Sequence, residues 1–225
     1  MCGRYALTLP QDAMVNLFEA VPANDLPDGQ NYNICPTDAV HVVVPGASRR
    51  LVAMRWGFLP HWYKSPTDGP LLINARSETI AEKPAFRAAC RERRCLIPTS
   101  GFYEWTKDAD GKRLPWFIRQ PEPMVMAGIW QTWGHGDAEV NTCAVVTCPA
   151  GARMQAIHHR MPVILTPSEW PLWLGEVSGK AAPLMRSAVE DQLDFFRVDP
   201  KVNSNRASGP DLLEPIEDVG DKKAG

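Results

Sequence analysis

The distribution of proline and glycine constrains the fold of this chain more than any other feature of its sequence. Twenty-one prolines and 16 glycines are spread through 225 residues, so few stretches are long enough for an extended helix. Both residues interrupt helices, and both are common in the turns that join strands. The pattern therefore predicts many short strands connected by turns, with only a few helices.

Short apolar runs between these interruptions have the length of strands. Two of them flank the turn-forming sequence PGASRR, and their spacing favours a largely antiparallel sheet or a partly closed barrel. We therefore expect an α+β protein, a single domain whose barrel-like β core is flanked by a few helices. The expected strands are Ala39–Val44, Leu51–Trp56, Arg94–Ile97, Gly101–Trp105, Trp116–Arg119, Val125–Trp130, Thr142–Thr147 and Asp194–Val198.

Three segments have helical features. Gln11–Ala20 follows a proline and spaces its apolar residues as a helix does, and Glu78–Cys90 is a second candidate. Thr166 and Glu169 have the spacing of a capping box around a proline, which predicts a helix over Pro167–Leu174. We expect one domain over residues 1–207 and a flexible acidic tail over residues 208–225.

Composition and charge exclude several classes of protein. Apolar residues make up 44% of the chain and charged residues 22%, and no apolar run approaches the roughly 18 residues that span a bilayer. The net charge is −2; residues 211–225 hold five acids and two lysines, which leaves +1 for the rest. We expect no membrane association and, without a signal-peptide pattern, a cytoplasmic protein whose six cysteines form no disulfide framework. A disordered chain and a histone-like basic protein are excluded as well.

The start of the chain, Met1-Cys2-Gly3-Arg4, is its most unusual motif. If Met1 is removed, Cys2 carries a thiol and a free α-amine, whose ordinary pKa values are about 8.5 and about 8. The amine can condense with an aldehyde to an imine, and the thiol can then close a five-membered thiazolidine ring. Alternatively, the thiol can attack an acyl carbon. A plainer interpretation is that Cys2 is only a small residue near the terminus.

Three other positions combine chemistry-bearing side chains with an informative context. Asn74 and Arg76 offer an amide and a phosphate-binding fork, or else a helix cap with a surface ion pair. Glu104 stands among aromatic residues, where burial would raise its pKa and suit it to proton transfer, unless it lies on a solvated face. His158 titrates near neutral pH and is a candidate acid or base, or an ordinary surface or core histidine.

Aromatic, basic and cysteine patterns give weaker signals. Six of the eight tryptophans lie between positions 56 and 133. A tryptophan at the rim of a cleft can stack on an unpaired base, and we choose Trp62 for this role. Residues 86–94 carry a net charge of +3, which fits either a phosphate track or a solvated helix face. Two Cys-x4-Cys pairs, at 90/95 and 143/148, are spaced more loosely than most zinc ligands, so we expect no metal.

Four motifs, ordered along the chain, together resemble the SRAP family, the SOS response-associated peptidases that are also known as abasic-site processing proteins. Shorter matches occur at Tyr32-Asn33, Pro36, Trp56-Gly57 and residues 145–147, so the resemblance extends over about residues 2–205. The four motifs are MCGR at 1–4, NARSE at 74–78, GFYEW at 101–105 and HHRMP at 158–162.

The resemblance implies a single α+β domain with a positively charged cleft for single-stranded DNA. It implies that Cys2, freed by loss of Met1, forms a covalent thiazolidine with abasic sites and shields them in DNA repair, with associated lyase and self-processing peptidase activity. By the same resemblance, Asn74 holds the Cys2 terminus, and Glu104 orients the amine and moves protons. His158 helps to open the deoxyribose ring and assists strand scission or reversal of the adduct. His159 occupies the variable position of its motif and receives no role.

The same resemblance assigns partners. We expect single-stranded DNA containing abasic sites as the partner, a monomeric protein, no cofactor and no metal; the sequence does not identify replication-fork partners. The residues expected to bind DNA are Arg4, Arg76, Trp62, Thr147 and Arg160.

Two other functions stay open on the residues alone. Glutamine amidotransferase domains also begin Met-Cys-Gly, and in that case Cys2 would attack an amide as an N-terminal-nucleophile amidohydrolase. Against this, Arg4 stands where those domains usually have an aliphatic residue, and no glutamine-binding motif follows. A non-catalytic single-strand binder would instead bind reversibly, with strong salt dependence and no preference for a lesion.

Overall fold

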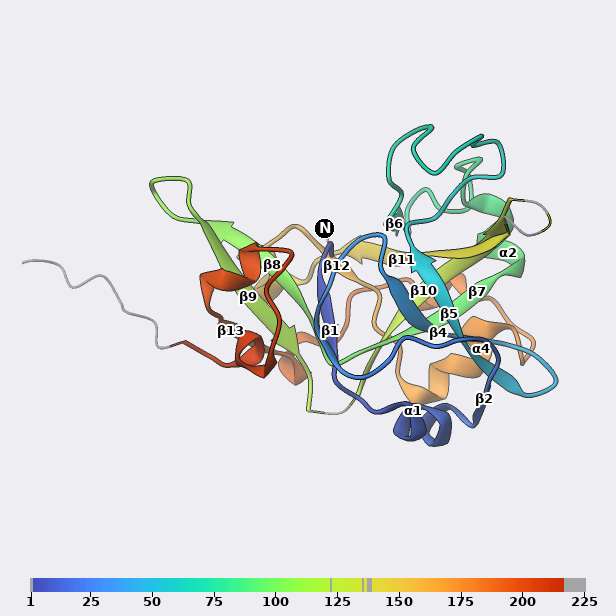
Figure 1. The fold of residues 1–225 in the computed structure, drawn as a ribbon, viewed down its shortest axis with the longest axis horizontal. Helices are drawn as coiled ribbons and strands as arrows, with labels where there is room; N and C mark the ends of the chain where they lie inside the picture. Colours follow the sequence, from blue (N-terminus) through green and yellow to red (C-terminus); the bar gives the residue numbers. More distant parts are fainter. Residues whose placement is uncertain (1, 122, 135, 137–138, 217–225) are drawn as a thin grey trace, which may run out of the picture.

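A closed β barrel forms the centre of the molecule (Figure 1). The computed structural model describes residues 2–121, 123–134, 136 and 139–216. Neighbouring barrel strands pair antiparallel, except that the last strand returns to β5 in parallel and closes the ring, with Thr142 opposite Arg55 and Cys143 opposite Trp56. The barrel strands are β4 (Ala39–Val44), β5 (Arg49–Trp56), β7 (Arg94–Thr99), β10 (Met124–Trp133) and β11 (Val140–Pro149).

Three short strands extend the barrel at its edges. β2 (Ala20–Pro22) pairs with β5, whereas β6 (Asn74–Arg76) and β12 (Arg160–Pro162) both pair with the ten-residue strand β11. The register places Thr147 opposite Arg76 on one side and Pro162 on the other. Strand β11 therefore brings two motifs together that are more than 80 residues apart in the sequence.

A second sheet is joined to the barrel at a sharp corner. β7 leads into β8 with only Ser100 between them, and a Cβ on Gly101 would lie 2.4 Å from the Phe117 ring and 2.6 Å from the Ile118 carbonyl oxygen. Only glycine fits at position 101, because β8 and β9 approach each other this closely here. The strand order is β13 (Asp194–Arg197), β9 (Arg113–Arg119), β8 (Gly101–Lys107), β1 (Tyr5–Leu7) and β3 (Asn31–Ile34).

The second sheet packs against a different apolar cluster on each of its two faces. The larger cluster fills the barrel and includes Phe102, whereas Tyr103 and Phe117 belong to a smaller one with Val198 and Leu212. Alternate residues of β8 therefore face different clusters, as successive side chains of a strand must. This alternation places Glu104 on the same face as Phe102.

The helices are short, and they confirm two of the three sequence predictions. α1 (Gln11–Phe18) ends where Glu19 turns left-handed, and α4 (Trp170–Leu174) follows the predicted capping box through a 3-10 turn at Pro167–Glu169. The predicted helix over 78–90 is wrong: this segment is mostly turns, and α2 spans only Arg87–Glu92. Pro84 explains the difference, because its ring and missing N–H interrupt a helix. The remaining helical segments are α3 (Ala152–Gln155) and 3-10 turns at Ala182–Leu184, Glu190–Gln192, Pro200–Asn203 and Pro210–Leu213.

The eight predicted strands are confirmed within a few residues at their ends, and the fold class is the expected barrel-centred, mostly β single domain. The predictions missed β1, β2, β3, β6 and β12, which have only three or four residues each. A strand of that length shows no alternation to detect, and it forms only because a distant partner strand supplies its hydrogen bonds.

The chain beyond residue 207 continues to pack against the second sheet. Leu212 is fully buried, Val198 pairs with Pro215, and the Ile216 amide donates to the Arg197 carbonyl. The expected domain boundary at 207 is therefore not the end of the packed structure, and residues 217–225 of the expected tail lie outside the described residues. In the part of the chain that is described, no helix is long and apolar enough to cross a membrane.

Buried His41 on β4 predicts a pH dependence of stability. It is 5% exposed, its Nε2 has no hydrogen-bond partner among the described residues, and burial lowers its pKa. The unfolded chain therefore binds the proton more readily, and the fold loses stability as pH falls below the unfolded pKa of about 6.5. We expect His41→Asn to reduce the loss of unfolding free energy between about pH 7 and pH 5, by up to about 1.4 kcal/mol per pH unit. Urea unfolding at both pH values measures this.

The control for this experiment is His61→Asn, because His61 is exposed. That substitution should leave the pH dependence unchanged. An equal pH dependence in the wild type and in His41→Asn would contradict the prediction.

Candidate functional site

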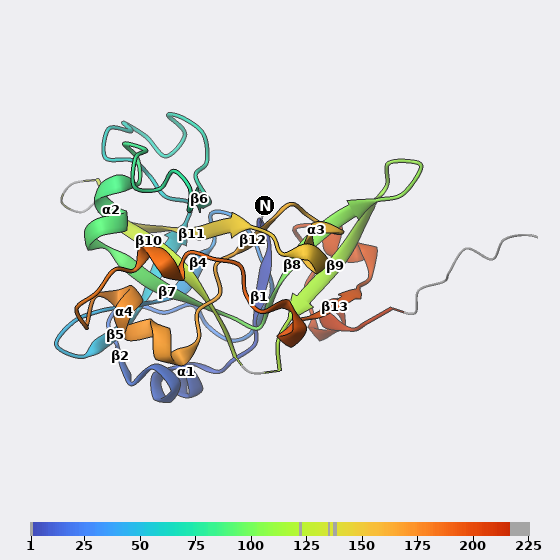
Figure 2. The same cartoon turned by 180° about the vertical axis from the view of Figure 1, so that it is seen from behind.

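The N-terminal segment is held between two strands of the second sheet. Tyr5 lies opposite Phe102 on β8 and opposite Ile34 on β3, and the Tyr103 amide donates to the Arg4 carbonyl at 2.9 Å. These contacts leave Cys2 fully buried at the junction of the second sheet and the barrel. In Figures 1 and 2 the blue start of β1 lies on the same side of the molecule as β6 and β12.

Asn74 holds the Cys2 backbone. Its Nδ2 donates to the Cys2 carbonyl oxygen at 2.8 Å, and pairing of β6 with β11 sets its position opposite Val145. Its Oδ1 is buried and accepts no hydrogen bond from any described residue. NARSE therefore begins as a strand rather than as the expected lead into a helix, and its first side chain contacts the N-terminal motif.

Glu104 is buried next to Cys2. It is 3% exposed and lies opposite Trp116 on β9, so it occupies the desolvated environment and not the solvated face. Burial raises the pKa of this carboxyl group above its ordinary value. The carboxyl group is therefore protonated at a higher pH than an exposed glutamate.

The Cys2 thiol is also biased toward its neutral form. Burial raises its pKa well above the ordinary range, and the nearby charge of Glu104 raises it further. The thiolate is correspondingly rare at neutral pH.

Two stacked histidines complete the cluster. The ring centroids of His158 and His159 are 4.3 Å apart, and the Arg160 amide donates to His158 Nδ1 at 3.0 Å. Burial is the main cause of the lowered pKa of His158, so the neutral imidazole is favoured at neutral pH. His159 is exposed, and its positive charge contributes a small lowering to the pKa of Glu104, against the larger effect of burial. Sequence reasoning left His159 without a role, because only the fold shows which way each of the adjacent rings faces.

Arg160 forms a buried clamp. Its guanidinium is bound by both carboxylate oxygens of Glu78, at 2.6 and 2.9 Å, and donates to the Thr147 carbonyl at 2.8 Å. This bidentate pair lowers the pKa of Glu78 to about 2. Arg160 is 6% exposed and Thr147 is fully buried, whereas the Glu78 side chain is 46% exposed, so the clamp joins β12 and β11 inside the fold to the NARSE motif at the surface.

Arg4 forms a second clasp. It donates to Asn33 Oδ1 at 2.7 Å, to the Val202 carbonyl at 3.0 Å and to the side chain of Asn205. Its side chain is 7% exposed, so these hydrogen bonds tie β1 and β3 to the C-terminal segment. The DNA-binding role expected for Arg4, like that for Arg160 and Thr147, stays a prediction, whereas the structural role is visible.

Arg76 and Trp62 are the two expected DNA-binding residues that face solvent. Arg76 is exposed at the end of β6, and the Trp62 side chain is 47% exposed in the loop between β5 and β6. That loop projects beside the start of β1 in both ribbon views (Figures 1 and 2). The segments that carry these two residues therefore lie on the same side of the molecule as the start of β1.

A protein-family model matches most of the chain, including every residue of the site described above. The family model described as SOS response associated peptidase (SRAP) matches residues 1–205. The chain belongs to this family. The resemblance expected from the four motifs is confirmed.

Two curated members of the SRAP family are similar over their whole length. The chain is 32% identical to the abasic site processing protein YoqW of Bacillus subtilis, over 95% of this chain and 99% of that protein. It is 29% identical to the abasic site processing protein YedK of Escherichia coli, over 96% and 100%. A crystal structure of a protein from Bacteroides thetaiotaomicron has the same fold, with a TM-score of 0.83 and 22% identity over 96% of this chain and 100% of that chain.

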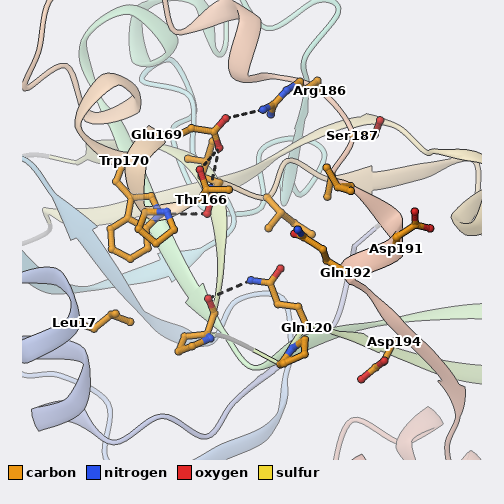
Figure 3. Close-up of a pocket in the computed structure, with 17 residues that line it drawn as sticks. Leu17, Gln120, Thr166, Glu169, Trp170, Arg186, Ser187, Asp191, Gln192 and Asp194 are labelled. Carbon is orange, nitrogen blue, oxygen red and sulfur yellow. Dashed lines mark hydrogen bonds and ion pairs between the residues drawn. The ribbon is translucent and has the colours of Figure 1, made fainter.

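A cavity of about 670 Å³ lies away from this SRAP site, between α1, α4 and β13 (Figure 3). Leu17, Trp170 and Asp194 line it, and none of Cys2, Asn74, Glu104 or His158 does. Among the described residues, no group of three or more His, Cys, Asp or Glu side chains is arranged to hold a metal ion.

The Arg160 clamp predicts a large effect of a conservative change. Arg160→Lys leaves a buried site with one donor group where two carboxylate oxygens and a carbonyl require a fork. We expect the unfolding free energy to fall by about 1–2 kcal/mol, measured by urea denaturation, because the hydrogen bonds to Thr147 are buried whereas the Glu78 side chain is 46% exposed and solvent screens its charge. Arg186→Lys is the control, because its ion pair with Glu169 is exposed at the arginine and should change stability by less than about 1 kcal/mol. Equal losses in the two variants would contradict this assignment.

Proposed function

We propose that this protein processes abasic sites in single-stranded DNA by capturing them covalently through Cys2. Family membership supports the substrate, because its curated relatives are named for abasic site processing. The observation that carries the chemistry is the position of Cys2, with its carbonyl bonded to Asn74 and its thiol beside Glu104. Removal of Met1 adds the free amine to this cluster.

The reaction follows from that pair of nucleophiles. The Cys2 amine attacks the C1′ aldehyde of the open abasic sugar, and loss of one water gives an imine. The thiol then adds to the imine carbon, and its proton ends on the nitrogen, which closes the thiazolidine ring. The balance is one aldehyde and one aminothiol converted to one ring and one water, with no oxidant or reductant.

The neutral state of the buried groups suits these steps. A protonated Glu104 can donate to the ring oxygen of the closed sugar and so supply the open aldehyde, and the resulting carboxylate can accept the thiol proton. The acceptor atom of Asn74, which lacks a described partner, can receive the N–H of the captured amine. Asn74 thus holds both the carbonyl and the nitrogen of Cys2.

His158 provides a second proton-transfer group. As a neutral imidazole whose Nδ1 accepts from the Arg160 amide, it can exchange a proton with the sugar. If the thiol does not close the ring, the imine permits β-elimination and strand scission, which is the associated lyase activity. An unpaired strand is favoured because no base pair has to be opened to admit the sugar. Exposed Arg76 and Trp62 would contact the flanking phosphate and base.

Loss of the Cys2 thiol separates capture from scission. We expect Cys2→Ala, with Met1 removed, to form no heat-stable adduct with an abasic single-stranded oligonucleotide. Without the thiol, the amine can form the imine but not the thiazolidine ring. Strand scission should rise instead. Denaturing gels and intact-mass measurement detect both products, and Cys90→Ala, which removes a half-buried thiol on α2, should behave as the wild type. The same heat-stable adduct in Cys2→Ala would contradict the proposal, as would glutaminase activity without any adduct.

Replacement of Glu104 by a residue that does not titrate should change the pH profile of capture. With its pKa raised by burial, wild-type Glu104 loses its proton as pH rises through that elevated value, so the rate falls on the alkaline side. The acidic side falls because the amine is protonated. We expect Glu104→Gln to slow adduct formation by about 100-fold at neutral pH and to abolish the alkaline limb, without loss of stability. Single-turnover rates from pH 5 to 9 measure this, and an unchanged alkaline limb would contradict the role.

A further inference from the structure

The helix that precedes the histidine pair has no cap of its own. α3 contains only four residues, and its N-cap, Gly151, has no side chain to accept from the free backbone amides. A helix of one turn is unstable by itself, and its first amides need acceptors. The position of the residues that follow α3 therefore depends on contacts from elsewhere in the fold.

Glu190, from a distant 3-10 turn, supplies those acceptors. Its Oε2 accepts from the Arg153 amide at 2.8 Å, and its Oε1 accepts from the Met154 amide at 2.9 Å. The Arg153 side chain donates back to the Glu190 carbonyl at 2.8 Å and stacks over the Phe195 ring. One carboxylate thus caps the helix across 36 residues of sequence, and the contact is reciprocal.

A single residue, Met154, connects this cap to the site. Met154, which is fully buried, donates its amide to Glu190 and accepts the His158 amide on its carbonyl at 2.8 Å. We propose that Glu190 is a positioning residue that fixes the His158 ring by capping α3. Its catalytic consequence rests on the proposed function, whereas its effect on the histidine does not.

Gly151 leaves the space that the Glu190 carboxylate occupies. A Cβ at position 151 would lie 2.5–2.7 Å from the Glu190 carboxylate, and the three atoms nearest to it all belong to that group. A methyl group here therefore displaces the far end of a flexible side chain. Gly151→Ala provides a second route to the same defect without removal of the carboxylate.

Glu169 provides a control that distinguishes an effect on the position of His158 from a general loss of stability. Glu169 also caps a helix start, accepting from the Thr166 amide at 2.8 Å, but α4 carries none of the site residues. Loss of either cap should cost stability by about 1 kcal/mol. Only the loss of Glu190 should change the behaviour of His158.

The first experiment follows the His158 ring by NMR during a pH titration, with the signal assigned by His158→Asn. In the wild type and in Glu169→Ala, we expect the same midpoint, lowered by burial. In Glu190→Ala and Gly151→Ala, the loosened loop exposes the ring, and the midpoint should rise by at least about half a pH unit. Glu190→Gln, which keeps one acceptor oxygen, should lie between. A His158 midpoint unchanged in both Glu190→Ala and Gly151→Ala would overturn the proposal.

The second experiment is a double-mutant cycle on abasic oligonucleotide. Glu190→Ala should slow strand scission or adduct reversal about three- to tenfold in the wild-type background and have no effect in His158→Ala. Equal effects in both backgrounds would show that Glu190 does not act through His158. If the wild type forms no adduct at all, the proposed function fails, and the titration alone decides the role of Glu190.

Discussion

The pairing of β1 with β8 and β3 is the contact on which the site depends. Tyr5–Leu7, near the start of the chain, form a strand between β8 and the edge strand β3 of a five-stranded sheet, and this pairing leaves Cys2 buried near Glu104. A terminal residue would otherwise be among the least ordered parts of a chain. Here its backbone is held from the second sheet by β8 and from the barrel by Asn74. A reactive pair of groups at a terminus thereby acquires a defined position.

Two charged motif residues stabilise the structure that surrounds the site. Arg4 ties the first strands to the C-terminal segment, and Arg160 joins Glu78 to Thr147 beneath the histidine loop. Each guanidinium is nearly buried, where a partner is required because an uncompensated charge is costly. Arginine in a motif therefore has two possible meanings, a ligand contact or an internal clamp. In this molecule the internal contacts of both residues are evident.

Burial has the same consequence for three groups of different chemistry. It favours the neutral thiol of Cys2, the protonated carboxyl of Glu104 and the neutral imidazole of His158. Neutral groups can pass protons to one another without leaving a bare charge in a poorly solvated place. A site of this kind suits condensation and ring closure, in which protons move at each step and no net charge accumulates. The proposed reaction is therefore sensitive to how these groups are held, which is why we propose a role for the cap on α3.

The sequence by itself determined the family, the fold class and most of the longer strands. Proline and glycine spacing limited helix length, and four ordered motifs named the residues of the site. Pro84 should have ended the second predicted helix, so that error was avoidable from the sequence. The three-residue strands, the facing of His158 and His159 and the capping of α3 by Glu190 were decided only by the tertiary structure. Each depends on hydrogen bonds or stacking set by the folded chain, some between residues tens of positions apart, and no local pattern encodes such a partner.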